Sequence, residues 1–171
     1  MIIQLHQIGK EKSRFEFDLS QKQVEELEDR FQFSQMHCVA ELKQNMDSLF
    51  LSGDLSVDLE TNCDCCLTGV ILPVETSFEV KLLAEQSQTQ QSNDSEVSLQ
   101  GIDVETYNGF EVDLGKLFGD QLLLEIPFSI KCKDSCKGIC SHCGKNLNQN
   151  QCNCQAENSD SPFAILKQLD P

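Results

Sequence analysis

Alternating hydrophobic and polar residues in the first half of the chain predict an antiparallel sheet. In residues 13–19, phenylalanine and leucine occupy every second position between charged residues, and residues 47–61 show the same period over a longer stretch. Because successive side chains of a strand point to opposite faces, a period of two indicates strands with one buried face. Gly53 and Asp54 interrupt the second stretch and predict a local irregularity there. The pattern predicts further strands at residues 2–8, 36–44, 70–83 and 102–107.

Three other segments have the start signals of helices. Ser20 and Gln23 have the spacing of a capping box, and an apolar stripe of helical period follows them. Asp113 can cap a second helix, which must end before Pro127 because proline cannot continue it. Ser161-Pro162 predicts the start of a short last helix. The apolar stripe of the first helix consists of Val24, Leu27 and Phe31.

One segment is too polar to contribute to a core. Residues 85–98 read EQSQTQQSNDSEVS and contain almost no apolar side chains. Such a segment cannot bury enough surface to offset the entropy lost on ordering, so a mobile loop is predicted.

The cysteines are the strongest chemical signal in the chain. Six of the ten fall within 23 residues, and a C-x2-C pair lies far upstream. Zinc takes four soft ligands in a tetrahedron, and two thiolates separated by two residues can reach one ion from a single turn. We therefore predict one or two structural zinc ions. The candidate ligands are Cys63, Cys66, Cys132, Cys136, Cys140, Cys143, Cys152 and Cys154.

The eight cysteines can be partitioned in two ways. In the first, the upstream C-x2-C pair joins Cys132 and Cys136, and the remaining four close a local site. In the second, the two C-x2-C pairs share one ion in a ribbon. Disulfides or free thiols are a third interpretation, although adjacent Cys65 and Cys66 disfavour independent bridges. Cys65, Cys38 and His142 are expected to lie outside the metal sites.

These elements together predict an α+β fold. It consists of an antiparallel sheet with a few helices and a C-terminal cysteine-rich zinc lobe. We divide the chain into a sheet body at residues 1–130, a metal lobe at 131–154, and a polar spacer with the terminal helix at 155–171.

The charge of the chain restricts its partners. The net charge is −15, so wrapping of bare nucleic acid is disfavoured, because phosphate binding relies on lysine and arginine. An acidic body suits a partner with a basic surface, such as a ribosomal protein, although acidic surfaces also serve solubility alone. Four lysines stand near the cysteines against Asp134 alone, and they either form a small basic face for RNA or offset thiolate charge. They are Lys131, Lys133, Lys137 and Lys145.

Several functional classes lack their sequence signals. There is no secretory signal, no apolar run long enough to span a membrane, no phosphate-binding glycine loop and no nucleophile elbow. We therefore expect a cytoplasmic protein that is not an enzyme. A thiol–disulfide redox protein using Cys63 and Cys66 is the main alternative, although the sequence after Cys66 predicts a strand and not the helix that activates such a thiol. A metal-sensing regulator is a further alternative.

The motifs from residue 50 onward resemble those of the bacterial and plastid YceD family. Cys63-Asp-Cys-Cys66-Leu67 is similar to the C-x-R-C-L signature of the family, with Cys65 in place of the usual arginine. Leu124-Glu-Ile-Pro127, the clustered cysteines, and the ending from Ser161-Pro162 follow in the family's order. The resemblance implies a role in accumulation of large-subunit (23S) ribosomal RNA, with the eight cysteines as metal ligands and no defined catalytic residues. We therefore expect an acidic, non-enzymatic ribosome biogenesis factor that binds a ribosomal protein, a ribosomal RNA precursor, or both.

Overall fold

The computed structural model describes residues 1–9, 12–24, 27, 29–45, 48–84, 103–107 and 110–154. Contacts along the chain divide it into two compact units. The first, called here the sheet body, comprises Met1–Thr61 and Val70–Phe128. The second, called here the cysteine unit, comprises residues 62–69 and 129–154 of the described chain. The sequence-based division placed residues 62–69 in the body, whereas these contacts group them with the cysteines downstream.

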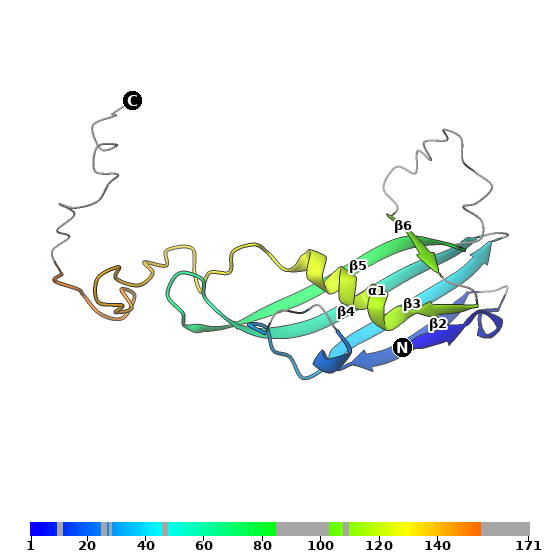
Figure 1. Ribbon diagram of the computed structural model, residues 1–171, viewed down its shortest axis with the longest axis horizontal. Helices are drawn as coiled ribbons and strands as arrows, with labels where there is room; N and C mark the ends of the chain where they lie inside the picture. Colours follow the sequence, from blue (N-terminus) through cyan, green and yellow to red (C-terminus); the bar gives the residue numbers. More distant parts are fainter. Residues whose placement is uncertain are drawn as a thin grey trace, which may run out of the picture. The chain divides into compact units, whose positions relative to one another are not determined.

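A five-stranded sheet forms most of the sheet body (Figure 1). Its order is β2-β3-β4-β5-β6, and β2 and β3, like β3 and β4, are antiparallel. The strands predicted at 13–19, 36–44, 47–61 and 70–83 are all present. Their bounds are β2 Ser13–Leu19, β3 Met36–Asn45, β4 Ser48–Asn62, β5 Gly69–Ala84 and β6 Asp103–Tyr107.

The sheet is mixed, which corrects the prediction of an antiparallel sheet. The last strand, β6, runs parallel to β5, with Val80 opposite Asp103. Parallel neighbours need a connection of about a dozen residues or more, and residues 85–102 are long enough to supply it. The mobile loop predicted at 85–98 lies outside the described residues, as does the terminal helix predicted after Ser161.

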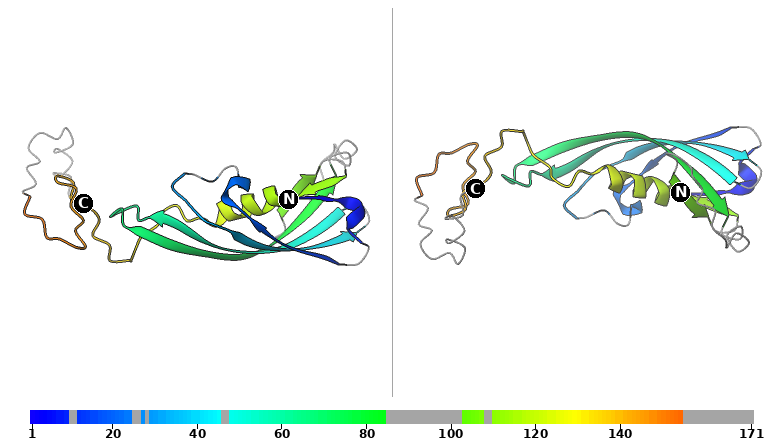
Figure 2. Two further views of the ribbon diagram at one scale, coloured as in Figure 1. Left: turned by 90° about the horizontal axis from the view of Figure 1, so that it is seen from below. Right: turned by 90° about the horizontal axis from the view of Figure 1, so that it is seen from above.

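A small second sheet and one helix cover a face of the large sheet. Strands β1 (Ile2–Gln4) and β7 (Glu111–Asp113) pair antiparallel, and α1 (Leu114–Glu125) follows β7 directly. The Asp113 side chain accepts a hydrogen bond from the Lys116 N–H at 3.2 Å, so the predicted cap is confirmed. Figure 2 shows α1 lying along the concave face of the sheet. The core between them includes Phe118 and Leu122 of α1, both fully buried.

The strand predicted at residues 2–8 is shorter than expected. It ends at Gln4 and continues as the 3-10 turn η1, Leu5–Gln7. The Leu5 N–H donates to the Phe110 carbonyl at 2.8 Å, which holds the chain at the point where the strand ends.

The helix predicted after Ser20 is a single 3-10 turn in the described residues, η2 at Gln21–Gln23. The capping box of Ser20 and Gln23 does form. Farther on, Phe31 and Phe33 are both buried, and Gln32 between them pairs with Glu60 in an isolated β-bridge. The chain there has a period of two, so tertiary pairing overrides the helical pattern that the sequence suggested.

Gly53 does not interrupt β4, which corrects the expected irregularity. The register with β3 runs through it without a break, placing Gly53 opposite Ala40. Gly53 lies on the buried face, where a Cβ would stand 2.6 Å from Phe78 Cε1 and 2.9 Å from Phe118 Cζ. Glycine is therefore used here because the two rings occupy the place of a side chain.

α1 is the one α-helix in the part of the chain that the structure describes, so helices are fewer than expected although α+β broadly fits. With 12 residues, α1 is too short to cross a bilayer, and none of the described helices has the length and hydrophobicity to do so.

Candidate metal centres

The turn between β4 and β5 presents the upstream cysteine pair. The Cys63 N–H donates to the Thr68 carbonyl at 2.9 Å, and the Leu67 N–H donates to the Cys63 carbonyl at 2.9 Å. Leu67 adopts a left-handed backbone, with φ of 59°. These bonds fold residues 63–68 into a tight knuckle with both thiols on its inner side.

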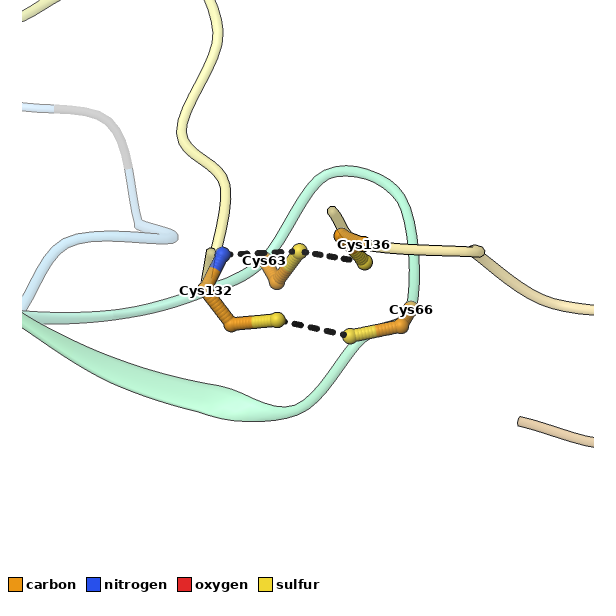
Figure 3. A group of neighbouring side chains, drawn as sticks. All are labelled: Cys63, Cys66, Cys132 and Cys136. Atoms are coloured by element: carbon orange, nitrogen blue, oxygen red, sulfur yellow. Dashed lines mark hydrogen bonds between the residues drawn. The ribbon is translucent and has the colours of Figure 1, made fainter. Parts of the chain in front are cut away.

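Four sulfurs meet at this knuckle and form the first cysteine group, Cys63, Cys66, Cys132 and Cys136 (Figure 3). All four sulfurs lie within 4.8 Å of one another. The Sγ atoms of Cys63 and Cys136 are 3.8 Å apart, and those of Cys66 and Cys132 are 3.5 Å apart. A zinc–sulfur bond of about 2.3 Å places the sulfurs of a tetrahedral site about 3.8 Å apart, so the group fits such an ion.

Backbone and side-chain bonds hold residues 130–136 against the first knuckle. The Asp64 N–H donates to the Ile130 carbonyl at 2.8 Å, and the Ile130 N–H donates to an Asp64 carboxylate oxygen at 2.6 Å. The Cys132 N–H donates to Cys63 Sγ at 3.3 Å. This pairing fixes the position from which Cys132 and Cys136 reach their partners.

The second cysteine group consists of Cys140, Cys143, Cys152 and Cys154, again with all sulfurs within 4.8 Å. Cys152 Sγ lies 3.3 Å from Cys140 Sγ and 3.5 Å from Cys143 Sγ. Two members of this group are exposed, whereas Cys63 and Cys66 of the first group are buried. The two groups are those of the first partition considered from the sequence, and each could hold a metal ion.

The same knuckle occurs twice in the cysteine unit. In the second, the Cys140 N–H donates to the Lys145 carbonyl at 2.8 Å and the Gly144 N–H donates to the Cys140 carbonyl at 2.9 Å. Gly144, with φ of +70°, takes the place that Leu67 has in the first. Two C-x2-C motifs therefore adopt one hydrogen-bond pattern, and the residue after the second cysteine is left-handed in both.

Two asparagines connect the second knuckle to the first group, and the sequence analysis missed them. Asn146 donates to the Cys66 carbonyl at 3.3 Å and to Thr68 Oγ1 at 3.1 Å. Asn148 donates to Cys136 Sγ at 3.3 Å and accepts the Lys137 N–H at 3.0 Å. Their position soon after Gly144 gave no sign of these bonds, which only the folded chain brings about.

Hydrogen bonds and burial shift the pKa values of the first group in opposite directions. Burial raises the pKa of Cys63, but N–H groups of Cys132, Cys66 and Cys65 outweigh it and hold this pKa at about 6. Thr68 lowers the pKa of Cys66 by hydrogen bonding. Hydrogen bonding to Cys66 raises the pKa of Cys132 to about 12.

The second group has the same division. Backbone N–H groups of Cys143 and His142 lower the pKa of Cys140 to about 6. Hydrogen bonding to Cys152 raises the pKa of Cys154 to about 12. Several thiolates in contact repel one another, and a divalent cation supplies the charge that lets all four ionise together.

The cysteines and histidine expected outside the sites do lie outside both groups. Cys38 is fully buried in β3, and burial raises its pKa to about 12. His142 is exposed and contributes its N–H to Cys140 Sγ at 3.4 Å. The Cys65 carbonyl lies beside Gly138, where a Cβ would approach it to 3.1 Å. All ten cysteines are free thiols, so the sulfurs are not joined in disulfides.

The lysines of the cysteine unit point to solvent. Lys131, Lys133, Lys137 and Lys145 are all exposed, and within the described residues none forms an ion pair with a carboxylate.

Comparisons with known proteins agree with the motifs. The model of a family described as "Large ribosomal RNA subunit accumulation protein YceD" matches residues 51–170. A protein from Arabidopsis thaliana, described as "Large ribosomal RNA subunit accumulation protein YCED homolog 1, chloroplastic", is 39% identical over 59 residues, which are 34% of this chain and 18% of the relative. A Zea mays protein with the same description is 41% identical over 49 residues, which are 28% of this chain and 17% of that relative. The chain thus matches less than a fifth of either relative. No solved structure matches it.

Proposed function

This chain belongs to the YceD family, and on that premise we propose that it is a non-enzymatic ribosome biogenesis factor supporting the accumulation of large-subunit (23S) ribosomal RNA. The observation that carries the proposal is the family match over residues 51–170, which includes both cysteine groups. The printed descriptions of the two plant relatives name the same process. The proposal places the protein where ribosomes are assembled, which in a bacterium is the cytoplasm.

Each cysteine group binds one zinc ion under this proposal. Four thiolates complete the coordination of zinc and leave no open position for substrate or water, which is typical of structural sites. The ion would hold residues 63 and 66 to residues 132 and 136 in one group, and close the second knuckle onto Cys152 and Cys154 in the other. Metal then stabilises the fold of the cysteine unit and performs no chemistry on a substrate.

Contact with RNA is assigned to the lysines of the cysteine unit. Residues 131–145 carry four exposed lysines against Asp134, whereas the whole chain has a net charge of −15. Each lysine that meets a phosphate releases counterions, so a local group of four can bind RNA that the acidic remainder repels. The acidic sheet body is assigned to a ribosomal protein or assembly factor with a basic surface.

The redox alternative has weaker support from the fold. A thioredoxin-like thiol sits at a helix N-terminus, where the helix dipole stabilises the thiolate. Cys63 and Cys66 lie instead in a turn between two strands, and both have sulfur neighbours from residues 132 and 136. Four converging thiols suit a metal better than a two-thiol exchange reaction.

The test of the proposal is a deletion with complementation. Cells without the protein should accumulate less 23S ribosomal RNA, and the tagged chain should sediment with large-subunit precursors in a sucrose gradient. The double variant Lys137→Gln and Lys145→Gln should shift toward the free fractions, because two phosphate contacts are lost. The proposal would be refuted by an unchanged level of 23S ribosomal RNA after deletion together with absence of the tagged chain from every precursor fraction.

A matched control separates local charge from net charge. Lys22→Gln and Lys43→Gln change the net charge by the same amount in the sheet body, where both side chains are exposed. This control should sediment as the unmodified chain does. Equal effects of the two double variants would argue against RNA contact through the cysteine unit.

A further inference from the structure

A groove of about 700 Å³ is lined by residues of the sheet body alone. It is lined by residues of β1, β5, β6, β7 and α1, beside β6, the last strand of the sheet. Leu82 and Val112 line it and are each only 1% exposed, so the groove reaches the edge of the hydrophobic core. An apolar side chain entering it would find apolar contacts.

Aromatic and acidic side chains stand around this groove. Phe110 is 77% exposed, and Tyr107 is partly exposed on β6. Glu105 and Glu111 are exposed on the neighbouring strands β6 and β7. Among the described residues Glu111 accepts only a long hydrogen bond of 3.4 Å from Gln4 Nε2, and Glu105 has no ion pair.

Three other charged side chains line the groove, namely Asp113, Lys116 and Asp120. Asp113 accepts the Lys116 N–H and lies 3.4 Å from the Met1 amino group. Its negative charge is therefore partly compensated. The formal charges of Lys116 and Asp120 cancel, so the two glutamates carry most of the net negative charge around the groove. A cation is stabilised both by carboxylates and by the face of an aromatic ring, so glutamates beside Phe110 and Tyr107 form a site for lysine or arginine.

We propose that this groove binds an extended, lysine- and arginine-rich segment of a partner protein, with its cations between Glu105, Glu111 and the rings and an apolar side chain toward Leu82. The inference rests on the proposed function for the class of partner, a basic ribosomal protein or assembly factor. It adds the place of contact and the residues that recognise the partner.

Charge disfavours the other possible occupants. The segment at 85–102 of this chain has Glu85, Asp94 and Glu96 and no lysine or arginine. The segment at 155–171 has three acidic residues against Lys167. A second copy of the chain, at −15, and RNA are both repelled by the carboxylates around the groove. A cationic polypeptide is the occupant with complementary charge.

The test uses the full-length chain and a short fluorescein-labelled peptide of alternating arginine, glycine and leucine. Fluorescence anisotropy should show binding that weakens with added salt. Glu105→Lys with Glu111→Lys should reduce the affinity about tenfold, since two opposed charges become repulsive. Phe110→Ser should reduce it about threefold through loss of the ring face. A peptide with glutamate in place of arginine should not bind.

The control carries the same change of net charge elsewhere on the sheet. Glu60 and Glu79 are exposed on β4 and β5 and do not line the groove. Glu60→Lys with Glu79→Lys should leave most of the affinity intact. An equal loss in this control, or no binding of the arginine peptide to the unmodified chain, would overturn the inference. Unchanged unfolding midpoints establish that all variants are folded.

The two proposals fail in different ways. The chain could be absent from precursor fractions while peptide binding still depends on Glu105 and Glu111. That result would refute the ribosomal role and support the groove as a site for cationic peptides. If the chain sediments with precursors but groove and control variants bind the peptide equally, only the assignment of the groove is refuted.

Discussion

Gly53 determines how closely the aromatic residues of the sheet body can pack over β4. The Phe118 ring lies 5.0 Å from the Phe78 ring and 5.4 Å from the Phe17 ring, centroid to centroid, both in edge-to-face arrangements. Such arrangements contribute about 0.5–1.5 kcal/mol per pair beyond burial. The Phe78 and Phe118 rings occupy the place that a side chain at position 53 would take, and glycine leaves that place open without breaking the strand.

Gly53→Ala should therefore destabilise the body. A Cβ within 2.9 Å of both rings forces them to shift, and overpacking of this kind costs about 1–3 kcal/mol. Urea unfolding followed by circular dichroism measures the change. Gly69→Ala is the matched control, because nothing lies within 4 Å of its Cβ position. A Gly53→Ala variant as stable as the control would show that the rings move freely.

Residues of the candidate metal centres differ in how far the sequence indicates them. The eight cysteines were predicted from their spacing: four form C-x2-C pairs, whose turns bring two sulfurs to one point, and the other four lie close by in the same short stretch of sequence. Asn146 and Asn148 do not, since their amides meet Cys66, Thr68 and Cys136 only after distant segments have come together. An asparagine is common in any turn, so its identity carried no signal.

At the scale of elements, the knuckle is the recurring unit. Both knuckles need a left-handed residue directly after the second cysteine, and this conformation costs a side chain about 1–2 kcal/mol. The second knuckle avoids that cost with Gly144, whereas the first places Leu67 there, a residue that is 64% exposed. The energy of the left-handed backbone is offset by the bonds that close the turn.

Gly144→Ala should weaken the second metal site through the backbone alone. Nothing lies within 4 Å of the Cβ position, so the loss reflects φ of +70° and not a steric clash. We expect zinc binding at this site to weaken by about 1 kcal/mol, which is about fivefold lower affinity in competition with a chelator. Gly144→Asn should lose less zinc affinity than Gly144→Ala, because asparagine tolerates the left-handed conformation better than alanine does. Equal affinities of all three proteins would contradict the backbone argument.

Strand periodicity was a better guide to elements than helix signals. Strands β2 to β5 follow from alternation, which the burial of their residues reproduces. The helix expected after Ser20 is only a 3-10 turn in the described residues. Gln32, between the buried Phe31 and Phe33, pairs with Glu60 of β4, and this contact between distant residues could not be predicted from the local pattern. The parallel pairing of β6 with β5 could not be predicted either, because the direction of a strand depends on the segment that connects it to its neighbour and not on its own sequence pattern.

At the scale of the whole molecule, the first cysteine group joins distant parts of the chain. Cys66 and Cys132 are 66 residues apart, whereas Cys140 and Cys152 are 12 apart. Closing the longer loop removes more freedom from the unfolded chain, by about 1.5 kcal/mol from the dependence of closure entropy on length. Metal in the first group should therefore contribute more to stability than metal in the second.

Zinc analysis of cysteine variants tests this order. The protein purified with reductant should contain two zinc ions per chain, and Cys66→Ser and Cys143→Ser should each contain one. Cys66→Ser should unfold at a lower urea concentration than Cys143→Ser, because it opens the longer loop. Cys65→Ser serves as the control and should keep both ions. Zinc-free protein, or loss of zinc in the control, would contradict the assignment of ligands.

The sequence by itself determined the strands of the sheet, the helix after Asp113 and which cysteines stand at ligand spacing. These depend on local geometry: a period of two, a capping side chain, and a turn that brings two thiols together. Only the tertiary structure decided which cysteine pairs meet, which amides support them, and where acidic and aromatic side chains enclose a groove. Such contacts join residues far apart in the chain, and their formation depends on packing that no local pattern records.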